Sequence, residues 1–142
     1  MTPIYPTCGE LERNLAQRIQ ALYRCQFGHR PQRIICHLFA DKLAIVAEES
    51  ITPVEQLLLR EGLLELNRLV RESIDRAIKP HLRAVIEEIL QVQVVELLCD
   101  TTFETGYTGV LAILTDTPQV RNPHAIPKIK SEQNGASDRR SS

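Results

Sequence analysis

Aromatic residues are scarce in this 142-residue sequence: tryptophan is absent, and there are three Phe and three Tyr. So few rings leave little surface on which nucleic-acid bases can stack. Neither sign of charge is in excess, because the formal net charge is −1. Such a chain has no general basic field to attract nucleic acid or an anionic membrane. We therefore expect no nucleic-acid partner.

Long apolar runs are absent as well. No stretch approaches the roughly 20 apolar residues that span a bilayer. The N-terminal "MTPIYPTCGELER" lacks the continuous apolar stretch of a signal peptide. The four cysteines, at positions 8, 25, 36 and 99, show no Cys-x-x-Cys spacing, so we expect reduced thiols. These features predict a cytoplasmic protein without direct membrane insertion.

The sequence also lacks the common catalytic motifs. It contains no Gly-x-Ser-x-Gly and no His-Glu-x-x-His, the patterns that mark α/β-hydrolases and zinc proteases. Glu87 and Glu88 are adjacent, and neighbouring helical residues point about 100° apart, so these two carboxylates do not converge on one substrate. We expect no catalytic residues and no enzyme activity.

The stretch "FGHRPQRIICH", residues 27–37, raises the question of a metal site together with Cys25. Zinc needs four convergent ligands. Gly28 is expected to end a helix before His29, and Cys36 and His37 are neighbours in a strand, where side chains alternate between faces. A phosphate-binding loop follows a strand and opens a helix, which is the reverse order. The stretch therefore predicts a helix end and a turn, without a metal or cofactor.

What the chain does contain is clear secondary-structure patterning. Residues 10–26 carry apolar residues at steps of three and four, which predicts an amphipathic helix. Gly28 and Pro31 then favour a helix end. Residues 33–39 and 42–48 are rich in β-branched residues and are separated by Ala40-Asp41, which predicts an antiparallel hairpin.

A second helix begins at a capping box, in which Thr52 is the N-cap, Pro53 the first helical residue and Glu55 the third. The apolar periodicity predicts one helix to about Lys79. Pro80 is expected to break or kink it, and "HLRAVIEEIL" continues as helix. The apolar stripe of the first part comprises Leu59, Leu63, Leu66, Val70, Ile74 and Ala77.

"VQVVELLC" and "TGVLAIL" predict a second hairpin, after which proline becomes frequent and periodicity is lost. We therefore expect an α+β fold of order αββα(α)ββ, with four mostly antiparallel strands and helices packed on one face. The predicted organisation is an N-terminal arm at 1–9, a single domain at 10–116 and a disordered C-terminal tail at 117–142.

The length of the second helix predicts self-association. A helix from residue 53 to about 79 is about 40 Å long at 1.5 Å per residue, more than a small sheet covers. A second copy is the simplest partner for the overhanging stripe, so we expect a homodimer. The expected dimer seam comprises Leu59, Leu63, Leu66, Val70 and Ile74.

One constellation suggests a ligand. On a continuous helix, Arg60, Leu64, Asn67 and Arg71 stand at i, i+4, i+7 and i+11 and form a row beside the apolar stripe. Arginines in such a row can bind a carboxylate or another small oxyanion, so Arg60, Asn67 and Arg71 are the candidate ligand-binding residues. Two alternatives are that the guanidinium groups lie in water, or that they pair with Glu across a dimer seam.

The ordered set "FGHRP", "ITPVEQLLL", "LNRLVRESI", Pro80, "VIEEIL" and "TGYTGVLAIL" resembles the MpsC domain family, named for a Na+-translocating membrane potential-generating system. The resemblance covers roughly residues 10–116. Arg30 stands where the family usually has a second glycine before the proline. Gly28, Arg30 and Pro31 are therefore candidate interaction residues.

The resemblance implies association with a membrane system that generates potential or supports inorganic-carbon uptake. Because no membrane span is expected, the chain itself is not the translocating subunit. We expect a cytosolic, homodimeric accessory or regulatory protein with peripheral contact to a membrane transport complex. A small-anion-binding sensor that uses the arginines of the long helix is the alternative.

Overall fold

A computed structural model describes residues 4–128 of the chain. The predicted α+β class and the order of elements are confirmed. The elements are α1 (Cys8–Phe27), β1 (Arg33–Phe39), β2 (Lys42–Glu48), α2 (Pro53–Arg60), α3 (Leu64–Leu90), β3 (Val94–Thr101), β4 (Thr108–Leu114) and a 3-10 turn (Pro123–Ala125).

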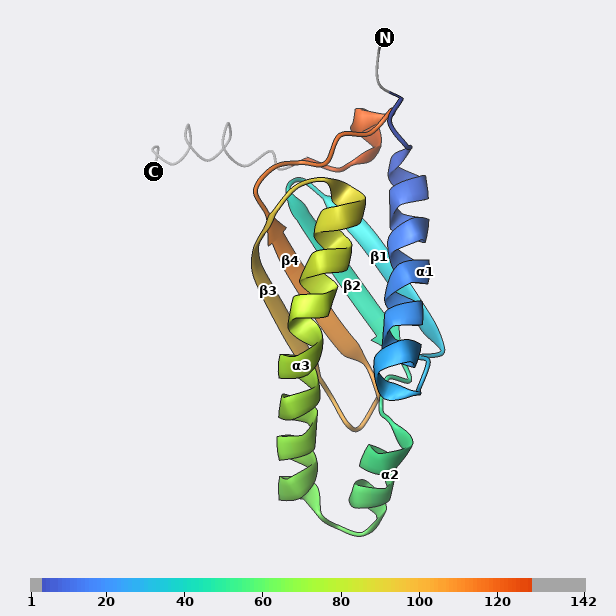
Figure 1. Ribbon diagram of the computed structural model, residues 1–142, viewed down its shortest axis with the longest axis vertical. Helices are drawn as coiled ribbons and strands as arrows, with labels where there is room; N and C mark the ends of the chain where they lie inside the picture. The colour runs from blue at the N-terminus through green and yellow to red at the C-terminus, as the bar shows by residue number, and fades with distance from the viewer. Residues whose placement is uncertain (1–3, 129–142) are drawn as a thin grey trace, which may run out of the picture.

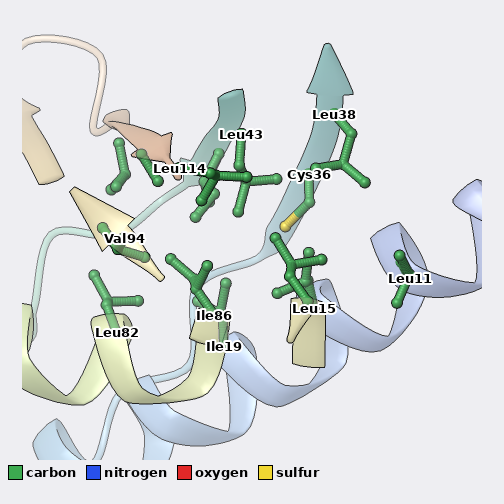
Figure 2. Close-up of a cluster of buried hydrophobic side chains, with 14 of the residues drawn as sticks. Leu11, Leu15, Ile19, Cys36, Leu38, Leu43, Leu82, Ile86, Val94 and Leu114 are labelled. Atoms are coloured by element: carbon green, nitrogen blue, oxygen red, sulfur yellow. The ribbon is translucent and has the colours of Figure 1, made fainter. Parts of the chain in front are cut away.

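The four strands form one antiparallel sheet in the order β1-β2-β4-β3. Helices α1 and α3 lie on the same face of this sheet, and α2 lies beyond its end (Figure 1). Figure 2 shows the resulting core, in which apolar side chains of both helices point toward those of the sheet. The labelled core residues include Leu15 and Ile19 of α1, Leu82 and Ile86 of α3, and Leu43 and Leu114 of the sheet.

Helix α1 follows the predicted periodicity, with Leu11, Leu15, Ile19 and Tyr23 buried. It begins at Cys8, two residues before the predicted start, because Thr7 and Glu10 form a capping box. The helix ends at Gly28, whose φ of 66° is the left-handed conformation that favours glycine.

The predicted single helix from residue 53 to about 79 is wrong. Two helices, α2 and α3, are separated by residues 61–63, where Gly62 has a φ of 73°. Glycine adopts this conformation without the steric cost that a Cβ imposes. The apolar periodicity continues across the break, which is why it conceals the turn.

Pro80 was expected to break or kink the helix, and it does not break it, because α3 runs from Leu64 to Leu90 with Pro80 inside it. Proline removes one intrahelical hydrogen bond and crowds the preceding turn. Buried residues on both sides, Ile78 and Leu82, anchor the helix to the core. Tertiary packing therefore outweighs the local penalty.

The sequence predicts a disordered tail from residue 117 onward. This prediction is wrong for residues 117–128, which are part of the fold. Val120 and Ile126 are buried in the main core cluster. The Arg121 backbone N–H donates to the Pro6 carbonyl at 2.9 Å, and the Ala40 N–H donates to the Pro127 carbonyl at 2.6 Å. This segment, which includes the 3-10 turn at Pro123–Ala125, therefore packs against the core. The rest of the predicted tail, 129–142, lies outside the described residues.

The free edge of β1 carries a polar contact from α1. A carboxylate oxygen of Glu12 accepts a hydrogen bond from the backbone N–H of Leu38 at 2.8 Å. The same oxygen lies 3.5 Å from the Nδ1 atom of His37. An α1 side chain therefore occupies a donor that the edge strand would otherwise present to solvent.

Candidate functional site

The most distinctive part of the molecule is a helical arm, which we define as residues 52–77, comprising α2 and the N-terminal half of α3. The arm extends beyond the end of the sheet (Figure 1). A capping box starts α2, in which Thr52 Oγ1 accepts from the Glu55 N–H and the Glu55 carboxylate accepts from the Thr52 N–H. The turn at Gly62 then brings α2 back against α3.

A buried ion pair joins the two helices of the arm. Arg71 of α3 donates from Nε to one oxygen of Glu55 at 2.7 Å and from Nη2 to the other oxygen at 2.6 Å. The Glu55 side chain is 0% exposed and the Arg71 side chain 7% exposed. This two-point geometry is the strongest form of the Arg–carboxylate contact. It fixes the orientation of α2 on α3.

Neighbouring polar groups extend the pair into a network. Arg71 Nη2 also donates to the Ser50 carbonyl at 3.2 Å, and Asn67 Nδ2 donates to the Glu55 carbonyl at 3.2 Å. The Ser50 hydroxyl in turn lies 2.6 Å from the Thr108 hydroxyl at the start of β4. The arm is therefore connected through hydrogen bonds to the sheet.

Asp75 lies one helical turn after Arg71, with Oδ1 3.5 Å from Arg71 Nη1. Oδ1 is buried and has no hydrogen-bond partner among the described residues. Burial raises the pKa of this carboxyl above its ordinary value, and the positive charge of Arg71 opposes the rise. Burial likewise raises the pKa of the nearby Cys99 thiol to about 12. Cys99 is therefore a thiol at neutral pH.

Arg71 and Asp75 of α3 and Cys99 of β3 help to line a cleft of about 540 Å³, which also reaches the loop that joins β3 to β4. The loop contributes Thr102 and Phe103. Arg71 already donates two hydrogen bonds to Glu55, so most of its guanidinium group is not available to a ligand in the cleft.

The structure brings together two of the three predicted ligand-binding residues. Asn67 and Arg71 meet around Glu55, whereas Arg60 lies exposed at the end of α2. The predicted row does not form, because the helix ends between Arg60 and Asn67. Of the alternatives, pairing of Arg71 with a glutamate is observed, within one chain. Sequence reasoning missed Glu55 as the partner, although its place in the capping box was recognised.

The arm also exposes an apolar surface. Predicted seam residues Leu63 and Leu66 are 47% and 48% exposed, while Leu59, Val70 and Ile74 are partly buried. Val54, Leu57 and Leu69 are further exposed apolar residues of the arm. A shallow groove of about 370 Å³ runs along it, lined by Phe27, Leu69, Val70, Ser73, Ile74 and Ala77.

The other candidate residues lie in the turn between α1 and β1. Arg30 is exposed and Pro31 is buried, with its carbonyl accepting from Gln20 Nε2 at 2.7 Å. Cys36 is buried in the core, and His37 lies on the opposite face of β1. Within residues 4–128, no group of three His, Cys, Asp or Glu side chains is arranged to hold a metal ion.

Comparison with protein families gives one match over most of the chain. Residues 7–116 match the family described as "MpsC: Na+-translocating membrane potential-generating system (MpsC)". The chain belongs to the MpsC family. Neither the curated proteins nor the solved structures contain a match to it. In the described part of this MpsC chain, no helix combines the length and apolar character needed to cross a membrane.

The MpsC resemblance and the buried network involve the same residues. Thr52, Glu55 and Arg71 lie in the segments "ITPVEQLLL" and "LNRLVRESI" that carry the resemblance, and the structure places all three in one cluster. Their visible role is to build the arm. What the arm exposes is therefore the more informative guide to function.

Proposed function

We propose that this MpsC protein is a cytosolic, homodimeric accessory or regulatory protein of a membrane ion-translocating or inorganic-carbon uptake system. In this proposal it contacts that system peripherally and catalyses no reaction. The family description supports the membrane association. The observation that carries the proposal is the apolar surface of the arm.

Large exposed apolar surfaces on a protein commonly mark sites of protein–protein contact. On the arm, Leu66 and Leu69 are exposed beside the apolar groove, and Leu63 is exposed at the turn before α3. The Glu55–Arg71 pair holds the two helices that present these residues. A surface held this firmly loses little conformational entropy on binding. We infer that two copies pair through this surface and that the dimer docks on the membrane complex.

Light scattering and membrane retention test the proposal. The unmodified chain should be a dimer at micromolar concentration and should be retained on membranes that contain its transport complex. Leu66→Glu should reduce the mass and abolish retention, because an unpaired charge in an apolar contact is costly. Arg76→Glu is the matched control, since it changes the charge of an exposed α3 residue. Equal masses and equal retention for all three proteins would contradict the proposal.

A small-anion sensor remains the second candidate because Arg68 and Arg71 line the 540 Å³ cleft, although Glu72, Asp75, Asp100 and Glu104 line it too and oppose an anion. It has less support, since Arg71 contacts Glu55 and Arg60 lies on another helix. A thermal-shift screen with bicarbonate, phosphate and nucleotides distinguishes the candidates, because a ligand that binds only the folded state raises the melting temperature.

A further inference from the structure

Strand β3 forms one edge of the sheet, because it pairs with β4 on one side alone (Figure 1). In an antiparallel strand, the backbone groups of successive residues point alternately to the two sides. The Thr102 N–H donates to the Tyr107 carbonyl at 3.1 Å, toward the β4 side. Every second residue back from Thr102 therefore points toward β4. The intervening residues, whose N–H and C=O groups face the open side, are Leu97, Cys99 and Thr101.

The start of this open side is occupied by side chains of α3. Arg83 donates to the Val94 carbonyl, and a carboxylate oxygen of Glu87 accepts from the Val94 N–H at 2.8 Å. Within residues 4–128, no hydrogen bond reaches the three outward-pointing residues that follow. A strand edge with free backbone groups is a template to which another strand can add.

Two hollows flank these free groups. One is the 540 Å³ cleft described above, which Cys99 and Thr101 line together with residues of α3. The other, which we call the Pro80 hollow, has a volume of about 330 Å³ and is lined by Pro80 and Arg83 of α3 and by Leu97 of β3. Peptides that bind by strand addition gain affinity from main-chain hydrogen bonds, and hollows for alternate side chains give specificity. The β3 edge offers both.

The 540 Å³ cleft favours a positive charge. Two guanidinium groups line it, but Arg68 is paired with Glu65 and Arg71 with Glu55. Carboxylates are in excess there, because the lining also includes Glu72, Asp75, Asp100 and Glu104. A basic side chain in this cleft would be complementary to its charge.

The Pro80 hollow has the opposite balance. Lys79 and Arg83 line it, and Glu96 is the one carboxylate among its lining residues. Lys79 is exposed, and its flexible stem can turn the ammonium group toward a carboxylate of the added strand. The two ends of the β3 edge therefore select opposite charges.

We propose that an extended segment of a partner protein adds to the open side of β3 as a fifth strand, with a basic side chain opposite Thr101 and an acidic side chain opposite Leu97. The segment runs antiparallel to β3, the slightly more stable pairing. Its first, third and fifth residues exchange backbone hydrogen bonds with Thr101, Cys99 and Leu97. Residues opposite each other in a ladder lie on the same face, so these three side chains point toward α3 and the two hollows.

Charge disfavours a second copy of this chain as the added strand. In a two-fold pairing of β3 with β3, Glu96 and Asp100 of both copies would lie on the same side of two adjacent strands. Like charges on neighbouring strands are destabilising. The proposal uses a different surface from the apolar one that pairs the arms, so it can hold if the arm dimer fails.

Fluorescence anisotropy with a labelled, end-capped peptide tests the proposal on the full chain. The probe Arg-Lys-Val-Thr-Glu carries its basic residue first and its acidic residue fifth, and its Lys lies beside Asp100. We expect saturable binding. The reversed peptide Glu-Thr-Val-Lys-Arg has the same composition and should bind at least about tenfold more weakly. No binding of the probe at about 1 mM, or equal binding of both peptides, would overturn the proposal.

N-methylation separates strand addition from attraction between charges alone. A methyl group on the nitrogen of the third residue removes the donor to the Cys99 carbonyl and should abolish binding. A methyl group on the nitrogen of the fourth residue replaces an N–H that points away from β3, so binding should be nearly unchanged. Equal affinities of the two methylated peptides would exclude strand addition.

Charge reversal in the cleft tests the protein side. Glu72 is an exposed residue of the cleft, so Glu72→Lys should weaken binding of the probe at least about tenfold. Glu61→Lys is the matched control, because Glu61 is exposed and does not line the cleft. Circular dichroism checks that both variants fold. Equal affinities of the two variants would contradict the proposed position of the basic residue.

Amide hydrogen exchange shows where the peptide binds. In the free protein, the N–H groups of Cys99 and Thr101 should exchange faster than those of Leu98 and Asp100, which β4 holds. The probe should slow exchange at Cys99 and Thr101. Unchanged exchange at both positions under saturating peptide would mean that the peptide binds elsewhere, and the proposal would fail.

Discussion

The two halves of α3 use one helix face in different ways. In the C-terminal half, Ile78, Leu82, Ile86 and Leu90 point into the core at steps of four. In the N-terminal half, the same row continues with Asn67 and Arg71, which are also buried. One half is held by apolar packing, and the other by a paired charge and hydrogen bonds.

This difference shows why the arm can expose its leucines and still keep a defined shape. Apolar packing is tolerant, because side chains of similar volume repack at modest cost. A bidentate ion pair accepts only one geometry. In the arm, the polar row therefore sets the position of α2, and the apolar residues beside it are left for contact with other molecules.

Removing Arg71 should have the largest effect. Arg71→Met leaves the Glu55 carboxylate, which is 0% exposed, without its charged partner, and breaking a buried pair in this way costs about 3–5 kcal/mol. Urea unfolding measures the change in the free energy of unfolding.

The double variant Glu55→Gln/Arg71→Met is its control, because glutamine still serves a capping box and no buried charge remains. It should recover most of the lost stability. An equal loss in the single and double variants would show that the charge pairing is not what holds the arm.

Truncating an apolar residue in each half of α3 sharpens the comparison. Leu82→Ala should lower the free energy of unfolding by about 2–5 kcal/mol, because it leaves a cavity in the core. Leu69→Ala should change the free energy of unfolding by less than about 0.5 kcal/mol, since Leu69 is 60% exposed. This measurement is made at a dilution that keeps the protein dissociated. Similar losses at the two positions would mean that the arm face is covered within the monomer.

Thr52 contributes less than the Glu55–Arg71 pair to the stability of the arm. Its Oγ1 accepts from the Glu55 N–H at 3.3 Å and donates to the Glu55 carboxylate at 2.9 Å. Thr52→Ala should cost about 1 kcal/mol, as the loss of an N-cap generally does. Thermal unfolding measures it, with Thr52→Ser as the matched control that retains the hydroxyl. Lost membrane retention at unchanged stability would instead assign Thr52 to a contact site.

The smallest expected effect concerns pH. The pKa of Asp75 is raised in the folded state by burial, so the folded protein holds this proton more tightly than the unfolded chain. The contribution of Asp75 to stability should therefore be most favourable below its ordinary pKa of 3.8 and should be lost as pH rises through the raised value. Asp75→Asn should remove this component, so its stability relative to the unmodified chain should increase over that pH range. A constant difference across pH would exclude the linkage.

Most of the body was predictable from local patterns. Apolar residues recur in α1 and in the strands of both hairpins at the spacing that places them on the face turned toward the core. Turn residues such as Gly28 mark where these helices and strands end. The segment around Val120 and Ile126 was not predictable, because its burial depends on contacts with residues far away in sequence. Three prolines indicated an irregular chain, but irregular structure is not the same as disorder.

The site was predictable only in part. The capping box identified Glu55 correctly, and Arg71 was recognised as chemically significant. The feature that was not predicted is the turn at Gly62, which reverses the chain direction and lets Glu55 contact Arg71. A helix assumed to be continuous places these two side chains far apart, so no argument from spacing joins them. A glycine within an otherwise apolar helical pattern is the feature that indicates such a turn.

The contact between Glu12 and the Leu38 backbone limits how this protein can aggregate. An unpaired strand edge is a template for strand addition and fibril growth. Here a carboxylate already accepts the Leu38 N–H, and the Pro127 carbonyl accepts the Ala40 N–H at the adjoining turn. At these two positions the N–H groups at the β1 edge and its turn are already occupied, which disfavours addition of a further strand there.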